Sequence, residues 1–168
     1  MGNLLNLIPK IESMHLRYGG DGSNGSIDCS HLVNKMLRDG GYDIPYEPTK
    51  DMANSKYFDK VLPDQIQAGD IALWPKQENE KGKTLNHSGV VVDPDEGTFF
   101  GSQSKGPKTE KYATRDFPVP EVFLRPKSEY FKGTPQGPSG VKPSKKPLED
   151  IKQKLGSAAK IPSPIILD

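Results

Sequence analysis

The spacing of apolar residues changes once along this chain, and the change indicates the fold class. In residues 4–14 and 29–38 the apolar side chains recur at three- and four-residue intervals, which predicts helices. From residue 70 onward, short runs rich in β-branched and aromatic residues lie between turn residues and predict strands. These strands are expected at 70–74, 88–93, 97–102 and 121–125. Helices first and strands afterwards indicate an α+β domain, with the helices packed on a small antiparallel sheet.

The composition changes near Pro126 and divides the chain into two parts. Residues 1–126 carry the periodic segments and predict one folded domain. Residues 127–168 are rich in proline and lysine and have too little apolar surface to offset the entropy of ordering. We expect a tail there, which either docks on a partner or packs on the parent domain. Within it, residues 147–156 predict a short helix, since acidic residues follow a proline and a glycine ends the segment.

Charge and cysteine content argue against several classes of protein. The net charge is +1, so no overall field attracts nucleic acid or a membrane surface. No run reaches the roughly 18 apolar residues of a membrane span. One cysteine and three histidines without metal-ligand spacing predict no internal disulfide, no metal and no other cofactor, and we expect a monomer. Residues 1–10 lack the blocks of a signal peptide, so synthesis in the cytoplasm without an export signal is expected.

Cys29 is the only cysteine, and it lies where a loop rich in Gly, Ser and Asn enters the second predicted helix. The first turn of a helix has unpaired N–H groups and partial positive charge, which favour a reactive thiolate. This residue alone leaves two interpretations open. It is either a nucleophile or a small buried thiol that packs as a hydrophobe.

His87 enters the predicted strand 88–93 after a polar loop over residues 77–83. A histidine at the start of a strand can face a helix N-terminus that packs across the sheet. Its imidazole would then take the proton of a thiol and later protonate a leaving amine. A histidine before an apolar strand can also be purely structural. The combination of His87 with Cys29 at a helix start favours the catalytic interpretation.

Several short motifs, in order and with consistent spacing, carry a family resemblance. They are Tyr18-Gly19-Gly20, Asp28-Cys29-Ser30, Gly41-Tyr42-Asp43-Ile44-Pro45, Ile66-Gln67-Ala68-Gly69-Asp70-Ile71-Ala72-Leu73 and His87-Ser88-Gly89-Val90-Val91-Val92. Over residues 10–104 the chain resembles the NlpC/P60 family of papain-like cysteine peptidases and amidases. The resemblance implies a papain-like NlpC/P60 fold, with Cys29 as nucleophile and His87 as general base. It also implies cleavage of amide bonds in the peptide stems of bacterial cell walls.

The resemblance implies roles for residues around this pair as well. Tyr18 is expected beside the thiol, where its hydroxyl would orient the nucleophile or bind the oxyanion; otherwise it packs in its loop. The third catalytic position aligns with Gly101, so the residue that orients His87 is absent or is supplied by Gln103, which we favour, or by Ser102. Candidates for substrate binding are Asp28, Ser30, His31 and Trp74. Asp28 is expected to cap the helix or, failing that, to be a solvated loop acid. His31 would line the substrate groove or lie on the helix surface, and Trp74 would form a groove wall or pack in the core.

The favoured function is therefore a peptidoglycan amidase or endopeptidase that acts as an antibacterial toxin or lytic enzyme. Residues 97–107 and 123–126 resemble small amidase toxins of interbacterial (type VI) secretion systems. Without an export signal, delivery to a target periplasm or cell wall by a secretion system or by lysis is expected, with an immunity protein or secretion component as partner. Two alternatives stay open: a papain-like deamidase or acyltransferase acting on a protein or lipid, and a binding module without catalysis.

Overall fold

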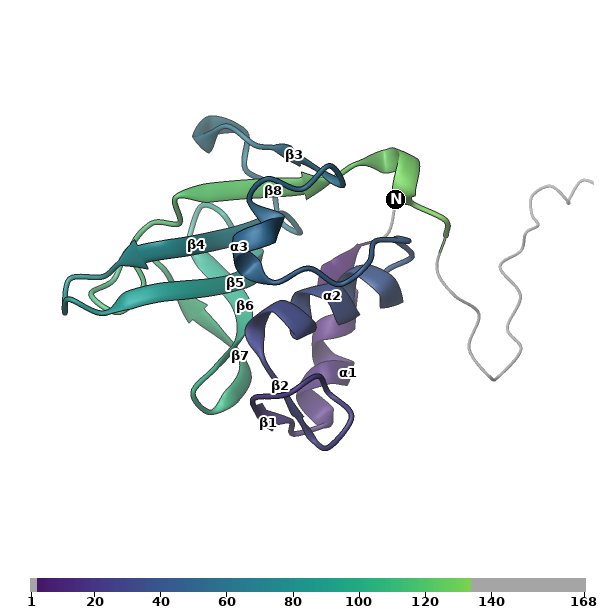
Figure 1. Cartoon of the computed structure of the whole chain (residues 1–168), viewed down its shortest axis with the longest axis horizontal. Helices are drawn as coiled ribbons and strands as arrows, with labels where there is room; N and C mark the ends of the chain where they lie inside the picture. The colour runs from purple at the N-terminus through teal and green to yellow at the C-terminus, as the bar shows by residue number, and fades with distance from the viewer. Residues whose placement is uncertain (1–2, 134–168) are drawn as a thin grey trace, which may run out of the picture. The chain divides into compact units, whose positions relative to one another are not determined.

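A six-stranded antiparallel sheet forms the centre of the fold (Figure 1). The structure, a computed structural model, describes residues 3–133. The strands follow the spatial order β3-β8-β4-β5-β6-β7, so β4 and β5 lie in the middle of the sheet. Their bounds are β3 Phe58–Lys60, β4 Ile71–Glu78, β5 Thr84–Asp93, β6 Thr98–Gln103, β7 Gly106–Lys111 and β8 Val122–Pro126.

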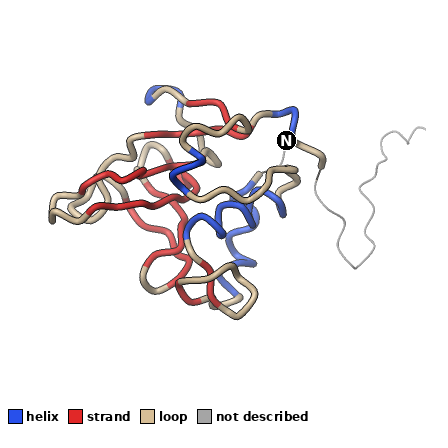
Figure 2. The backbone as a smooth tube through the Cα atoms, viewed as in Figure 1, coloured by secondary structure: helices blue, strands red, loops and turns tan. Residues whose placement is uncertain are grey.

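In the described part of the chain, four helices precede the sheet and pack on one face of it, whereas the short 3-10 helices η2 (Pro63–Gln65) and η3 (Ser128–Tyr130) are separate blue segments in Figure 2. The four are the 3-10 helix η1 (Leu4–Leu7), α1 (Ile8–Ser13), α2 (Cys29–Asp39) and α3 (Thr49–Met52). Between α1 and α2, β1 (Arg17–Tyr18) and β2 (Ser26–Ile27) form a short parallel pair. The predicted α+β architecture is confirmed. Among residues 3–133, no helix has the length and apolar character of a membrane span.

Helix α2 has clear start and stop signals in the sequence. The Asp28 carboxylate caps it by accepting a hydrogen bond from the backbone N–H of His31 at 2.8 Å, so the expected capping role of Asp28 is confirmed. The helix ends at Gly40 and Gly41, and Gly41 has a φ of +102°, which favours glycine. The apolar residues between these ends turn one buried stripe toward β5 and β6. They are Leu32, Val33, Met36 and Leu37.

Apolar side chains lie on both faces of the sheet and form two separate clusters. The larger cluster joins the apolar stripe of α2 to sheet residues that include Ile71, Leu73 and Phe100. The smaller cluster lies among Ala72, Trp74, Leu85, Val91, Phe99 and Phe123, with Phe117 from the loop before β8 packed against it. Because period-two alternation sends neighbouring residues of β4 to opposite faces, the strand contributes to both clusters. Burial on both faces explains why this strand reads as a nearly continuous apolar run.

Two strands of the six-stranded sheet were not predicted from the sequence, nor was the short pair β1 and β2, and two strands were longer than expected. β7 is a polar edge strand without apolar alternation, and β3 is short, so neither has the usual strand pattern. β4 extends to Glu78 and β5 begins at Thr84. The loop expected at 77–83 is therefore shortened to the hairpin turn at 79–83. The polar ends of β4 and β5 pair through backbone hydrogen bonds. The pattern of apolar side chains used to predict strands does not detect such pairing.

Residues 127–133 continue the folded part past β8. They include the 3-10 helix η3 (Ser128–Tyr130), and Phe131 packs edge-on against Tyr42 with ring centroids 5.2 Å apart. Backbone bonds from Asp43 to Tyr130 and from Lys132 to Gly41 hold this segment beside the end of α2. The boundary expected at residue 126 stays a prediction. The short helix expected at 147–156 lies outside the described residues.

Candidate active site

Cys29 is the first residue of α2, and this end of the helix packs against β5. The side chain is buried, with Sγ 4.0 Å from the hydroxyl oxygen of Thr49 and 4.0 Å from the carbonyl oxygen of Asn86. Asn86 directly precedes His87 in β5. The Thr49 hydroxyl donates in turn to the Ser88 hydroxyl at 3.1 Å. The fold therefore brings Cys29 to the part of β5 that carries His87, across 57 residues of sequence separation.

The start of α2 is tied to the sheet by Ser102. This residue is fully buried on β6, and its hydroxyl donates to the carbonyl oxygen of Ile27 at 2.6 Å. Ile27 lies two residues before Cys29, so the bond fixes the chain where it enters the helix. Because the hydroxyl is used there and does not bond His87, the structure corrects the expectation that Ser102 orients the imidazole.

His87 is buried among aromatic rings. Its ring centroid lies 5.4 Å from that of Trp74, 5.9 Å from Phe99 and 5.3 Å from Phe117. Burial lowers the pKa of His87 from 6.5 to about 4, because the apolar surroundings disfavour the charged imidazolium. The hydrogen bond with Gln103 raises the pKa and the positive charge of Lys83 lowers it. His87 is therefore neutral at pH 7 and can accept a proton.

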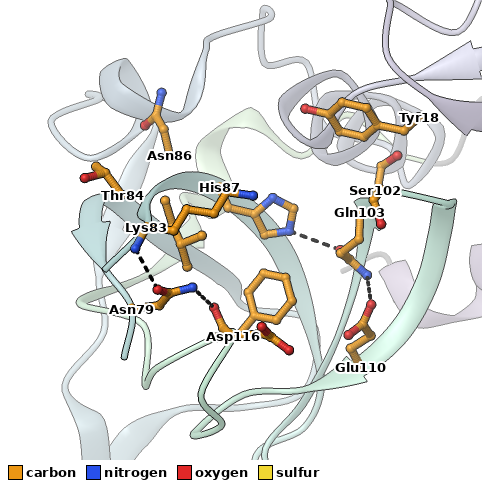
Figure 3. A pocket seen from close by; sticks show the side chains of 13 residues that line it. Tyr18, Asn79, Lys83, Thr84, Asn86, His87, Ser102, Gln103, Glu110 and Asp116 are labelled. Carbon is orange, nitrogen blue, oxygen red and sulfur yellow. Dashed lines mark hydrogen bonds between the residues drawn. The ribbon is translucent and has the colours of Figure 1, made fainter. Parts of the chain in front are cut away.

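Gln103, the last residue of β6, supplies the hydrogen bond to His87 (Figure 3). Its Oε1 lies 3.0 Å from His87 Nε2, while its Nε2 donates to the carbonyl oxygen of Lys108 and to Oε2 of Glu110, each at 3.2 Å. Both of the latter partners are acceptors, so the NH₂ end of the amide must face them. The amide oxygen then faces His87, and the network assigns the imidazole proton to Nε2. Nδ1 is left unprotonated, as a base requires.

Within residues 3–133, the hydrogen bonds of the Cys29 thiol run to Thr49 and Asn86, and none joins it to His87. Proton transfer needs the thiol within hydrogen-bond reach of Nδ1. Rotation about χ1 of Cys29 moves Sγ among staggered positions without moving the helix. Catalytic hydrogen bonds are often long or misaligned before substrate binds, and the contact between the thiol and the imidazole stays part of the proposed function.

Tyr18 lies near the same helix start. The pKa of its hydroxyl is raised, first by partial burial and then by the charges of Cys29 and Asp28. The phenol therefore keeps its proton at neutral pH and can act as a donor. Its side chain is also 52% exposed and borders the cavity beside His87. Tyr18 therefore lies within electrostatic range of Cys29, and its role beside the thiol stays a prediction.

A cavity of about 580 Å³ opens beside His87 and Gln103 (Figure 3). Its charged lining groups have both signs, with Lys83 from the β4–β5 hairpin, Glu110 from β7 and Asp116 from the loop before β8. Asn79 joins two of these walls, because its side-chain nitrogen donates to the carbonyl oxygen of Asp116 at 3.1 Å. A polar cavity of this size accepts a short peptide better than an apolar chain.

The residues that follow the helix start form a patch on the surface beside Cys29. Asp28 also lies 2.9 Å from Nδ1 of His31, and the His31 ring stacks on Tyr46 with centroids 3.9 Å apart. The Ser30 hydroxyl and the Tyr46 hydroxyl are 2.8 Å apart. This patch does not border the cavity beside His87. Asp28, Ser30 and His31 therefore do not bind a substrate inside this cavity. Their binding of a part of the substrate that lies outside it stays a proposal.

Trp74 lies in the core and not on a groove wall, so the structure corrects the expectation that it binds substrate and agrees with the core alternative. None of its surface is exposed, and its ring packs against His87, Phe99 and Phe117. Its indole N–H donates to the carbonyl oxygen of Pro118 at 2.6 Å, which anchors the loop that carries Phe117. Trp74 therefore supports the imidazole from behind and does not face substrate.

Sequence reasoning missed several residues of the site. Thr49 and Asn86 contact the thiol, Phe117 covers the imidazole, and Glu110 binds Gln103. None of them lies in a motif that indicates chemistry, and each reaches the site from an element distant in sequence. In the described part of the chain, no group of three or more His, Cys, Asp or Glu residues is arranged to hold a metal ion.

The lowered pKa of His87 predicts a loss of stability in mild acid. As the pH falls, the unfolded state with a pKa near 6.5 binds the proton before the folded state with a pKa of about 4. Stability is therefore lost between about pH 6.5 and pH 4 and does not fall further on this account. The loss amounts to about 3 kcal/mol.

Urea unfolding of the wild type and of His87→Gln at pH 7, 5 and 4 measures this effect. The variant should lack this share of the pH dependence, whatever its stability at pH 7. The exposed residue His15 provides the control, because His15→Asn should retain the wild-type dependence. Equal pH dependence in the wild type and His87→Gln would contradict the prediction.

The model of the NlpC/P60 family matches residues 14–118. This match includes the cysteine of α2, the histidine of β5 and the glutamine of β6. None of the curated proteins matches the chain.

Solved structures of the same family share its fold. An NlpC/P60 family protein from Bacillus cereus superposes with a TM-score of 0.57 and 18% identity, over 77% of this chain and 39% of its own. A protein similar to lipoprotein of the NLP/P60 family from Staphylococcus aureus gives 0.52 and 19%, over 73% and 40%. NlpC1 from Trichomonas vaginalis gives 0.53 and 18%, over 73% and 42%. The chain thus spans about two fifths of the length of these proteins.

Proposed function

We propose a function that proceeds from one premise, which is that this chain belongs to the NlpC/P60 family. The protein is a cysteine hydrolase that cleaves amide bonds in the peptide stems of bacterial cell walls. The family consists generally of cysteine peptidases and amidases, which gives the reaction class. One observation supports the proposal most strongly. A neutral histidine, held by a side-chain amide so that Nδ1 is free, lies next to the strand position that contacts a cysteine at a helix N-terminus.

The reaction begins with proton transfer from the Cys29 thiol to Nδ1 of His87. The thiolate attacks the carbonyl carbon of the scissile amide, and the carbonyl electron pair moves onto its oxygen. When this tetrahedral intermediate collapses, His87 gives its proton to the leaving amine and a thioester remains on Cys29. Water then attacks the thioester, with His87 as base, and releases a carboxylic acid. The thiol and the neutral imidazole are restored.

Two donors are available for the oxyanion of the intermediate. The backbone N–H of Cys29 belongs to the open first turn of α2 and has no hydrogen-bond partner among residues 3–133. The Tyr18 hydroxyl is the second donor, since its raised pKa keeps it protonated. The helix dipole adds partial positive charge at the same place and stabilises both the thiolate and the oxyanion.

The cavity supports a peptide substrate with charged groups. Lys83 can pair with a substrate carboxylate, and Asp116, which pairs with the exposed Lys81 at 2.6 Å, can exchange that partner for a substrate ammonium group. Cell-wall stem peptides carry both kinds of group, whereas a lipid acyl chain offers neither. This charge pattern favours a stem peptide over the lipid substrate of a papain-like acyltransferase.

Digestion of purified peptidoglycan by the wild type and by Cys29→Ala tests the proposed function. Mass spectrometry should find fragments that have gained one water molecule per cleaved amide, and only with the wild type. The mass of each fragment identifies the bond that is cut. Inactivity of the wild type on every wall type tested, together with a Cys29 that resists alkylation at neutral pH, would reject the proposal.

We also propose that the enzyme acts on target cells as an antibacterial toxin or lytic enzyme, delivered by a secretion system or by lysis. An immunity protein or a secretion component would then be its partner. The proposed substrate supports this role, because cleavage of wall peptides weakens a growing cell. The same pair of proteins tests it when each is directed to the periplasm of a Gram-negative host. Lysis by the wild type but not by Cys29→Ala is expected, and survival of both would reject the role.

A further inference from the structure

We propose that Glu110 is a positioning residue for the hydrolysis, and that it acts by fixing the orientation of the Gln103 amide. The inference rests on the proposed function, since it concerns the base of that reaction. Glu110 lies on β7, the edge strand that pairs with β6. Its Oε2 accepts a hydrogen bond from Gln103 Nε2 at 3.2 Å, and Gln103 Oε1 faces His87 at 3.0 Å (Figure 3).

A side-chain amide can be turned by about half a circle with little change of shape, so its orientation must be imposed by its neighbours. In the reverse orientation, Oε1 of Gln103 would face the Glu110 carboxylate and the carbonyl oxygen of Lys108. Three acceptors would then meet without a donor among them. Gln103 is 7% exposed, so water does not readily relieve this repulsion. The carboxylate of Glu110 adds negative charge to it, which the Lys108 ammonium 3.5 Å away offsets only in part.

Lys108 shows that Glu110 is itself held in place. The Lys108 ammonium lies 3.5 Å from the same oxygen, Oε2, that accepts from Gln103, and the Glu110 side chain is 28% exposed. Lys108 thus uses its carbonyl oxygen on Gln103 and its ammonium group on Glu110. The two residues lie on the same face of β7, since they are two positions apart.

Gly101 provides room for the amide end of the Gln103 side chain. A Cβ atom at this position would lie 2.6 Å from Oε1 of Gln103. A larger residue at this position would displace the amide end of Gln103 from its present place. The group that orients His87 is the side chain of Gln103, which lies two residues after Gly101 on β6 and reaches back over it.

The amide orientation decides which nitrogen of His87 is the base. With Oε1 toward the ring, the proton stays on Nε2 and Nδ1 can take the thiol proton. With the NH₂ group toward the ring, Nε2 would have to be the acceptor and the proton would move to Nδ1. That tautomer cannot accept the proton of Cys29. Glu110 therefore controls the base without contacting the reacting atoms.

Charge reversal and a conservative variant test this inference. In Glu110→Lys the new ammonium donates to Gln103 Oε1 and favours the reversed amide, so the His87 proton should move to Nδ1. In Glu110→Gln an amide oxygen remains to accept from Gln103, so the wild-type tautomer should persist. We expect kcat to fall about 100-fold in Glu110→Lys, with KM changed less than about threefold, and to fall less than about fivefold in Glu110→Gln.

Nitrogen-15 NMR of the His87 ring in the free full-length protein distinguishes the tautomers without any substrate. This readout remains valid if the proposed hydrolysis is not observed, so the two failures can be told apart. Glu96→Lys, an equal charge change at an exposed turn, is the matched control and should resemble the wild type. A His87 ring still protonated on Nε2 in Glu110→Lys would overturn the inference. So would a raised KM with unchanged kcat, because that result assigns Glu110 to substrate binding.

Discussion

Replacing Cys29 with serine is expected to lower kcat/KM for wall-peptide hydrolysis by at least about four orders of magnitude. A serine hydroxyl is far less acidic than a thiol, and the helix N-terminus alone does not make it a nucleophile. His87→Gln should cause a loss of similar size, since it removes the base that accepts the thiol proton. The double variant should lose little more than either single variant, because the two residues act as a unit.

Kinetics on one purified stem peptide measure these losses, and circular dichroism checks that each variant is folded. Thr49→Val is the matched control, because it removes a hydroxyl 4.0 Å from the thiol without removing the proposed chemistry. We expect it to cost about tenfold or less. Additive losses in the double variant would show that Cys29 and His87 do not act together and would contradict the proposed mechanism.

Trp74→Ala is expected to destabilise the fold by about 3–5 kcal/mol. The indole ring is fully buried between His87, Phe99 and Phe117, so its removal leaves a large cavity. The variant also loses the donor to the carbonyl oxygen of Pro118, which anchors the loop that covers the imidazole. Urea unfolding at pH 7 measures the loss of free energy.

Val119→Ala is the control for Trp74, since Val119 lies in the same loop and is 55% exposed. Its expected cost is below about 0.5 kcal/mol. A loss of less than about 1 kcal/mol in Trp74→Ala would contradict the buried position and would favour the groove wall that the sequence had suggested. The size of the effect therefore distinguishes the two interpretations of this residue.

The sequence predicted the helices and the apolar strands of the core well, because these elements bury periodic side chains. It did not predict β7, whose pairing depends on backbone groups that face β6 and not on its polar side chains. Glu110 was missed for the same reason. A glutamate on a polar edge strand has no pattern of its own, and its role appears only when β7 pairs with β6.

Among the residues of the candidate site, local chemistry identified Cys29, His87 and the cap Asp28. These residues lie in features that can be recognised in a short stretch of sequence. The features are a helix start, a loop rich in glycine and a polar residue before an apolar strand. The choice between Gln103 and Ser102 was not local. Successive residues of a strand point to opposite faces, so only the packed sheet decides which of them meets the imidazole.

The sequence by itself determined the α+β class and the candidate pair Cys29 and His87, because short-range periodicity and motif order carry that information. The tertiary structure alone decided that Gln103 holds the imidazole, that Ser102 fastens the start of α2 and that Trp74 lies beneath the ring. It also brought Glu110 to the far end of the Gln103 amide. These contacts join strands and loops distant in sequence, and their directions follow from strand register and burial, which no local pattern specifies.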